Sequence, residues 1–162
     1  MNKTIMSFFL CSATVFFLAA CGTKKLVYQK KYDLAEQQWV HSDTLNYDFT
    51  IADTLKIYDL VLEVEHAPSY SFQNLYVRIH TQFPTGERTQ EKVSLELADA
   101  AGKWQGNAHS DWVKTPIAIQ TGAYFNRKGK YTLTVEQFMR TDTLNGIKSV
   151  ALQMEDTEKK RN

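Results

Sequence analysis

The chain has 162 residues, of which 43% are hydrophobic, and its 19 Lys and Arg nearly balance its 18 Asp and Glu. This length is enough for one folded domain and too short for two of ordinary size. A chain with so little net charge offers no dominant positive surface for phosphate groups, so its composition argues against nucleic acid as a partner.

The first 20 residues are typical of a signal peptide. Lys3 is the only charged residue among them, and a largely apolar run extends from Ile5 to Ala20. This run is shorter than the roughly 20 apolar residues that span a bilayer comfortably, and it has the length of a secretory signal core. We therefore expect residues 1–20 to be cleaved from the mature protein.

The apolar run ends in the sequence Leu18-Ala19-Ala20-Cys21, the pattern called a lipobox. Small residues before the cysteine let an extended chain enter a peptidase site, and the thiol of Cys21 accepts a diacylglycerol. We predict that Cys21 carries a covalent lipid and that the protein has no other cofactor. Cys11 lies in the removed segment, which leaves no thiol for a disulfide, a metal site or a nucleophile.

Residues 21–30 are expected to form a lipidated tether. Its basic pair, Lys24 and Lys25, can lie near anionic head groups, although a solvated linker is the simpler interpretation. No acidic surface-export tag follows Cys21 closely, which favours a location facing the periplasm. The sequence leaves open whether the inner or the outer membrane holds the anchor.

The dominant hydrophobic period in the rest of the chain is two, which is typical of half-buried antiparallel strands. The alternating segments are 45–51, 58–65, 75–80, 93–98, 131–136 and 150–155. Turn residues separate these segments, and no long helical stripe is present. We expect an all-β fold, a two-sheet antiparallel β-sandwich with jelly-roll topology, over residues 31–156, followed by a disordered tail at 157–162.

Several segments, in their order along the chain, resemble the gliding-motility lipoprotein GldH family. They are Tyr70–Val77, Gly102–Gly106, Gly129–Thr132, Val135–Arg140 and Leu144–Ile147. The resemblance implies an envelope lipoprotein associated with the machinery that moves and secretes cell-surface adhesins, and other envelope proteins of that machinery as partners. Members of the family also occur in related bacteria that do not glide. The resemblance assigns a functional role to one position of this chain, Cys21.

Catalytic chemistry is not expected from the polar residues. The four histidines, at 41, 66, 80 and 109, lack the spacing of a metal site, and the adjacent residues His109-Ser110-Asp111 cannot form a catalytic relay. A hydrolase would need a pocket that joins one of the histidines to a carboxylate. Glu63 and Glu65 share one strand face, which we expect to be solvated. The sequence therefore predicts a protein that is not an enzyme and holds no metal.

Binding residues are sought among large aromatic side chains near predicted strand ends. Trp39, Tyr70, Trp104 and Trp112 are candidates for contact with a partner protein or a glycan, or they close the ends of the core. The leading hypothesis is a non-enzymatic accessory of gliding or adhesin secretion, and the alternative is a glycan- or peptidoglycan-binding module. An exposed line of Trp104, Trp112 and Tyr70 would favour the alternative. Gln137 falls on a core face and should bond to a buried backbone group.

Overall fold

The computed structural model describes residues 24–161, so the signal peptide and Cys21 lie outside the described residues. The strands are β1 (Lys25–Asp33), β2 (Gln38–Val40), β3 (Thr44–Ile51), β4 (Lys56–His66), β5 (Asn74–Gln82), β6 (Arg88–Glu96), β7 (Asn107–His109), β8 (Trp112–Ala123), β9 (Gly129–Gln137), β10 (Thr143–Asn145) and β11 (Ile147–Lys160), with one 3-10 turn, η1 (Ala35–Gln37). No helix within residues 24–161 is long and apolar enough to cross a membrane.

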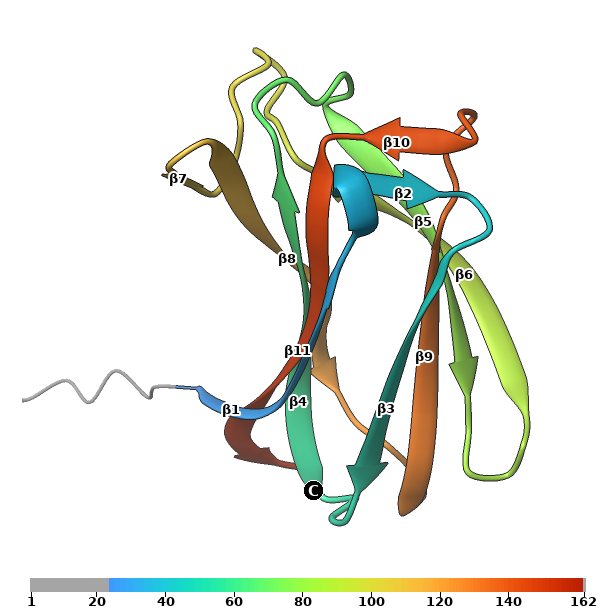
Figure 1. Cartoon of the computed structure of the whole chain (residues 1–162). Helices are drawn as coiled ribbons and strands as arrows, with labels where there is room; N and C mark the ends of the chain where they lie inside the picture. The colour runs from blue at the N-terminus through green and yellow to red at the C-terminus, as the bar shows by residue number, and fades with distance from the viewer. Residues whose placement is uncertain (1–23, 162) are drawn as a thin grey trace, which may run out of the picture.

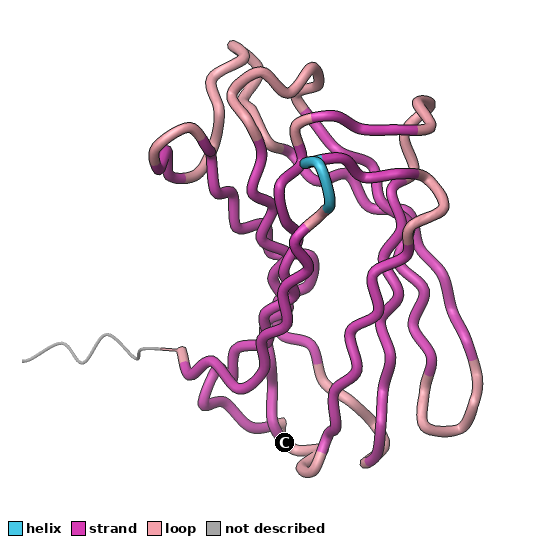
Figure 2. Tube along the Cα trace, in the orientation of Figure 1, coloured by secondary structure: helices cyan, strands magenta, loops and turns pink. Residues whose placement is uncertain are grey.

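Two antiparallel sheets face each other (Figure 1). One has the order β1-β11-β4-β8-β7 and the other the order β3-β9-β5-β6, while β2 and β10 form a small third sheet across one end. If the eight long strands are counted along the chain, the two sheets read 1-8-3-6 and 2-7-4-5, which is the order of a jelly roll. The prediction of an all-β sandwich with jelly-roll topology is confirmed. Loops gather at the two ends of the sandwich (Figure 2).

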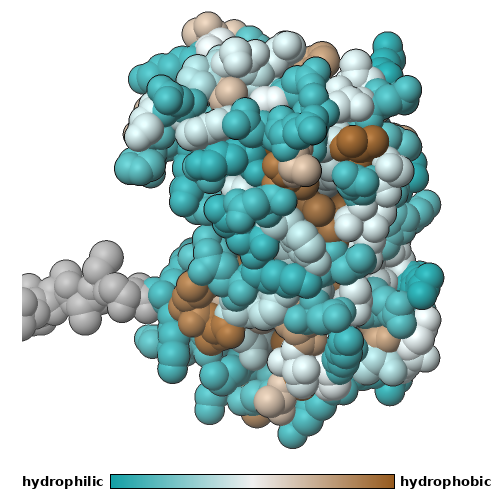
Figure 3. Space-filling model, in the orientation of Figure 1, coloured by the Kyte–Doolittle hydropathy of each residue, from teal (hydrophilic) through white to brown (hydrophobic). Residues whose placement is uncertain are grey.

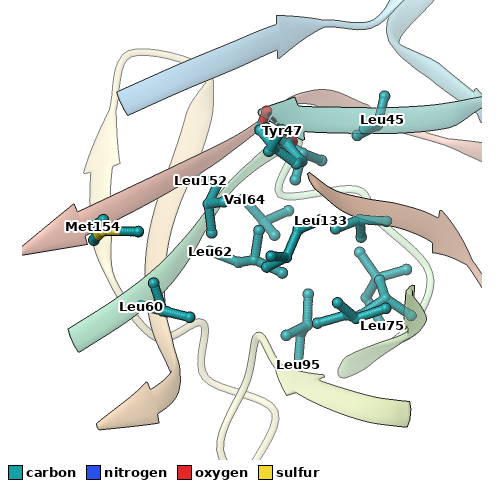
Figure 4. Close-up of a cluster of buried hydrophobic side chains, with 14 of the residues drawn as sticks. Leu45, Tyr47, Leu60, Leu62, Val64, Leu75, Leu95, Leu133, Leu152 and Met154 are labelled. Carbon is teal, nitrogen blue, oxygen red and sulfur yellow. Dashed lines mark hydrogen bonds between the residues drawn. The ribbon is translucent and has the colours of Figure 1, made fainter. Parts of the chain in front are cut away.

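The core lies between the inner faces of the two sheets, where side chains from facing strands meet (Figure 4). In β3 every second residue is buried, and in β4 the side chains of Leu62 and Val64 are fully buried. The hydroxyl of Tyr47 crosses the core and donates to the carbonyl of Val150 at 3.0 Å. Each of the six segments with alternating hydrophobicity overlaps a long strand, because period-two burial is the packing requirement of a sandwich.

Two long strands, β1 and β8, were not predicted from the alternation of apolar and polar residues. In β1 only Tyr28 and Tyr32 are even partly buried, so the strand carries no apolar alternation. In β8, Pro116 interrupts the sequence. The short strand β7 pairs with β8 only as far as Lys114, so Pro116 lies at the open edge of the sheet, where a missing N–H costs no ladder hydrogen bond.

The folded domain is wider than residues 31–156. β1 begins at Lys25, within the segment that we expected to be a tether, and β11 continues to Lys160, within the expected disordered tail. Backbone pairing explains both corrections, since Lys25 pairs with Asp156 and Lys160 pairs with Lys56. The side chains of β1 are largely exposed and residues 157–160 of β11 are polar, so neither segment carries the apolar alternation that would have revealed this pairing.

Several polar groups are buried and paired. Glu65 is only 7% exposed and accepts hydrogen bonds from Lys148 at 2.9 Å and Ser149 at 3.1 Å. Burial acts to raise the pKa of Glu65, but these two bonds and the charge of Lys148 outweigh it and hold the pKa below its ordinary value. The expectation of a solvated face was therefore wrong for Glu65, whereas Glu63 is partly exposed, 3.5 Å from Lys114.

Two further buried polar side chains lie at the end of the sandwich that β2 and β10 close. Gln137 is fully buried; its Nε2 donates to the carbonyl of Thr141 at 3.0 Å and its Oε1 accepts from the amide of Met139 at 2.9 Å, which confirms the expected backbone bond. His66 is also fully buried, with Nδ1 3.0 Å from the carbonyl of Ala67. Burial lowers the pKa of His66, and the Ala67 carbonyl opposes that effect only in part.

We predict that Trp39→Ala lowers the free energy of unfolding by about 3–5 kcal/mol, because the ring is fully buried and its removal leaves a cavity. Trp104→Ala should cost less, since Trp104 is only partly buried. Urea denaturation of the two variants and the parent protein measures both losses. A negligible loss for Trp39→Ala would contradict its position in the core.

We predict that acidification destabilises the domain in two stages. Because burial lowers the pKa of His66, stability should begin to fall as the pH drops below about 6.5, where the histidine of the unfolded chain takes up its proton. Hydrogen bonds from lysine side chains lower the pKa values of Asp59, Asp156 and Glu65, so a second loss should begin below about pH 4. Urea titrations across this pH range measure both stages. The first stage should be absent in His66→Phe, and its persistence would contradict the assignment.

Candidate functional site

Two of the four aromatic candidates lie in the core. Trp39 is fully buried in β2, and its Nε1 donates to the carbonyl of Asp43 at 2.9 Å. Tyr70, in the loop between β4 and β5, is 4% exposed. Both rings close one end of the sandwich beneath the small sheet and its neighbouring loops. The expectation that they contact a partner or a glycan is corrected, since neither ring is accessible in this fold.

The other two candidates are partly exposed but packed against the domain. Trp104 meets the ring of His66 edge-on, with 4.5 Å between ring centroids. Trp112 begins β8, and the ammonium group of Lys148 lies 5.0 Å from the centre of its ring. Because Tyr70 is buried, the exposed line of three rings that the glycan alternative required is not formed.

The histidines belong to different elements. His66 is buried at the end of β4, while His80 projects from β5 with Nε2 3.2 Å from a carboxylate oxygen of Glu136. His41 lies in the loop between β2 and β3, and His109 ends β7; both are exposed. Within residues 24–161, no group of three or more His, Cys, Asp or Glu side chains is placed to hold a metal ion.

A groove of about 640 Å³ opens where β5 begins and β9 ends, on the outer face of the β3-β9-β5-β6 sheet. We call it the aromatic groove. Its lining residues are Phe72, Tyr76, Lys92, Phe138, Met139, Arg140 and Thr141. Its three aromatic side chains are 36–38% exposed. Apolar surface exposed in one place is typical of an interaction site, whereas single scattered apolar residues need no explanation.

Strand geometry places the two central rings side by side. Leu75 and Val77 point into the core, so Tyr76 between them points outward. The pairing of β5 with β9 continues past the last residue of β9: the amide of Phe138 donates to the carbonyl of Tyr76 at 2.7 Å. In return, the amide of Tyr76 donates to Sδ of Met139 at 3.3 Å. These contacts fix the floor of the aromatic groove.

The buried amide of Gln137 fixes one wall of the aromatic groove. It binds the backbone of Met139 on one side and the carbonyls of Thr141 and Asp142 on the other. Residues 138–141 are therefore held by a side chain that solvent does not reach. Gln137 is a positioning residue for the groove and does not line it.

Cations border the aromatic groove. The guanidinium carbon of Arg78 lies 3.9 Å from the centre of the Phe138 ring, and the same group donates to Glu136 at 3.0 Å. The ammonium group of Lys92 lies 5.4 Å from the centre of the Tyr76 ring. Between residues 24 and 161, neither Lys92 nor Arg140 makes an ion pair. The groove thus combines an apolar floor with a positively charged rim.

The sequence held a signal for this groove that residue type alone did not reveal. Tyr76 occupies the polar phase of the alternation around Leu75 and Val77, and Phe138 occupies the same phase as Glu136. A large aromatic residue on the solvent face of a predicted strand is therefore the informative feature. Both residues lie in segments that resemble the GldH family.

Comparison with solved structures gives a distant match. A β-porphyranase of glycoside hydrolase family 86, from the human gut bacterium Bacteroides plebeius, aligns with 86% of this chain and 22% of its own, at 18% identity and a TM-score of 0.33. A similarity this low supports no statement about fold or activity.

Two relatives align over almost their whole length. The gliding motility lipoprotein GldH homolog of Christiangramia forsetii is 23% identical over 163 residues, covering 96% of this chain and 99% of the relative. The gliding motility lipoprotein GldH of Flavobacterium johnsoniae is 23% identical over 148 residues, covering 87% and 91%. The profile of the family described as GldH lipoprotein matches residues 26–154, from β1 to β11. The chain therefore belongs to the GldH lipoprotein family.

Proposed function

We propose that this protein is a periplasm-facing lipoprotein, anchored through Cys21, that acts as a non-enzymatic accessory of the gliding motility and adhesin secretion machinery. Family membership and the names of the two relatives support the link to gliding. The sequence Leu18-Ala19-Ala20-Cys21 supports the lipid anchor. The single observation that carries the binding role is the aromatic groove.

The composition of the aromatic groove suits a protein partner. Aromatic residues, methionine and arginine are enriched at protein interfaces, where a few such side chains supply most of the binding energy. Phe72, Tyr76 and Phe138 provide apolar area, and Met139 adds an adaptable side chain to the lining. The cationic rim of Lys92 and Arg140 favours a partner segment that inserts an apolar side chain and carries carboxylates beside it.

The groove is built before a partner arrives. Gln137 holds the loop that forms one wall, and the backbone bond from Phe138 to Tyr76 holds the floor. A preformed surface loses less conformational freedom on binding, which favours affinity. In addition, β6 lies at the edge of its sheet and contributes Lys92 to the rim, so a partner strand has free backbone groups beside the groove.

A glycan-binding role is the second candidate, because the same rings are exposed. A sugar stacks on the open face of an aromatic ring. In this groove the guanidinium group of Arg78 covers one face of Phe138, and Lys92 lies over Tyr76. These contacts reduce the ring area available for stacking and favour the protein partner.

We predict that the double substitution Tyr76→Ser with Phe138→Ser abolishes capture of the partner. Both side chains are more than a third exposed, so the free energy of unfolding should fall by no more than about 1–2 kcal/mol. The measurement is crosslinking in cells, pull-down of the tagged, lipidated protein and identification of its partners by mass spectrometry.

Val40→Ser is the matched control for this experiment. Val40 is exposed to the same extent as Phe138, 36%, but lies in β2 outside the aromatic groove. Pull-down of the Val40→Ser protein should recover the same gliding or secretion components as the parent protein. Unchanged recovery with the double variant would contradict the role of the groove, and recovery of polysaccharide without a stable protein partner would support the glycan alternative.

We predict that Cys21→Ala prevents lipid attachment and releases the protein from firm membrane association, because stable anchoring depends on the acyl chains. Metabolic labelling with palmitate and fractionation of cells measure both effects. Cys11→Ala is the control; it should keep the label, since Cys11 precedes the expected cleavage site. Normal membrane retention of Cys21→Ala would contradict the anchor.

A further inference from the structure

The two ends of the sandwich differ in charge, although the chain as a whole is nearly neutral. We call the lower end in Figure 1 the basic end; it comprises residues 24–25, 52–56, 83–88, 124–130 and 157–161. These segments contain ten Lys and Arg but three Asp and Glu. The loops of the opposite end, 34–43, 67–73, 97–111 and 138–146, contain two basic and five acidic residues.

Many cations of the basic end face solvent without an acidic partner. Among the residues that the structure describes, Arg127, Lys128, Lys159 and Lys160 make no ion pair. All four belong to the β8–β9 loop or the end of β11 and are exposed. Clustered cations of this kind are attracted to anionic phospholipid head groups, and the attraction is screened by salt.

The basic end and the adjoining first residues of β1 carry the most exposed large apolar side chains among residues 24–161. They are Tyr124 at 54%, Leu55 at 50%, Leu26 at 49% and Val27 at 44%. Apolar surface also gathers beside the start of the described chain (Figure 3). Arg161 joins two of these residues, because its amide donates to the carbonyl of Leu55 at 2.8 Å and its guanidinium carbon lies 4.9 Å from the Tyr124 ring centre.

The short chain after the anchor limits where the domain can lie. Only Gly22 and Thr23 separate Cys21 from Lys24, where the described chain begins. An extended chain spans at most about 3.6 Å per residue, so the α-carbons of Cys21 and Lys24 lie within about 11 Å of each other. If Cys21 carries the lipid, as the proposed function requires, the start of β1 cannot leave the head-group region.

We propose that the basic end docks on the anionic phospholipids of the membrane that holds the anchor. Exposed lysines and arginines then face phosphate groups, while Leu55 and Tyr124 sit at the level of the head groups, where an aromatic ring with a polar tip is well accommodated. The loops of the opposite end, which include residues 138–141 of the aromatic groove, point away from the bilayer. Docking therefore presents the groove to partners in the periplasm.

The test uses the lipidated mature protein in vesicles and places one fluorophore at either end. Cys21 is the only cysteine after residue 20, and its thiol is occupied by the lipid in the lipidated protein. An engineered cysteine is therefore the one thiol available for labelling. Thr54→Cys places the label in the β3–β4 turn at the basic end, and Ala100→Cys places it in a loop of the opposite end. Quenching by a lipid with a quencher on its head group reports the distance of each label from the bilayer surface.

In vesicles of phosphatidylethanolamine with phosphatidylglycerol, the Thr54→Cys label should be quenched several-fold more strongly than the Ala100→Cys label. The difference should shrink on adding salt, and in a variant that combines Arg127→Gln, Lys128→Gln, Lys159→Gln and Lys160→Gln. Lys103→Gln, which removes a cation from the opposite end, should leave it unchanged. Equal quenching of the two labels, or a difference that ignores both salt and the fourfold variant, would overturn the docking proposal alone. Failure of the protein to enter vesicles would overturn the lipid anchor and the docking proposal with it.

Discussion

The pairing of β11 with both β1 and β4 is the constraint on which the rest of the molecule depends. It joins the first strand of the domain, β1 at the edge of its sheet, to the last strand, β11, which lies between β1 and β4. Because Lys25 pairs with Asp156, the fold starts immediately after the predicted anchor and leaves almost no free linker. The same pairing carries the basic residues at the end of β11 to the end of the sandwich where the chain enters.

The second requirement is that the buried side-chain amide of Gln137 be hydrogen-bonded, since an unpaired buried polar group is costly. Gln137 meets it by binding the backbone of the following loop, and that bond shapes the aromatic groove on the other side of the sheet. Phe138 follows Gln137 directly and points outward because successive residues of a strand face opposite sides. Core packing and the candidate binding surface are thus set by neighbouring residues of one strand.

Sequence periodicity revealed the strands that bury every second side chain in the core. The alternation in Leu45–Ile51 or Tyr131–Glu136 is sufficient to place a strand, and it led to the sandwich. It could not reveal β1, whose place depends on backbone pairing with a strand more than a hundred residues away. The tryptophans were misleading for a related reason: position near a strand end does not distinguish a ring that closes the core from one that is exposed, and only tertiary packing decides it.

The most direct test of the central claim, that the aromatic groove binds an envelope protein, is site-specific photo-crosslinking in living cells. A photo-crosslinking amino acid in place of Tyr76 should yield a discrete protein adduct that contains a gliding or secretion component. The same amino acid in place of Asn46, which is exposed in β3 of the same sheet, should yield none. Adducts of equal yield at the two positions, or no adduct at position 76 in the lipidated protein, would contradict the account.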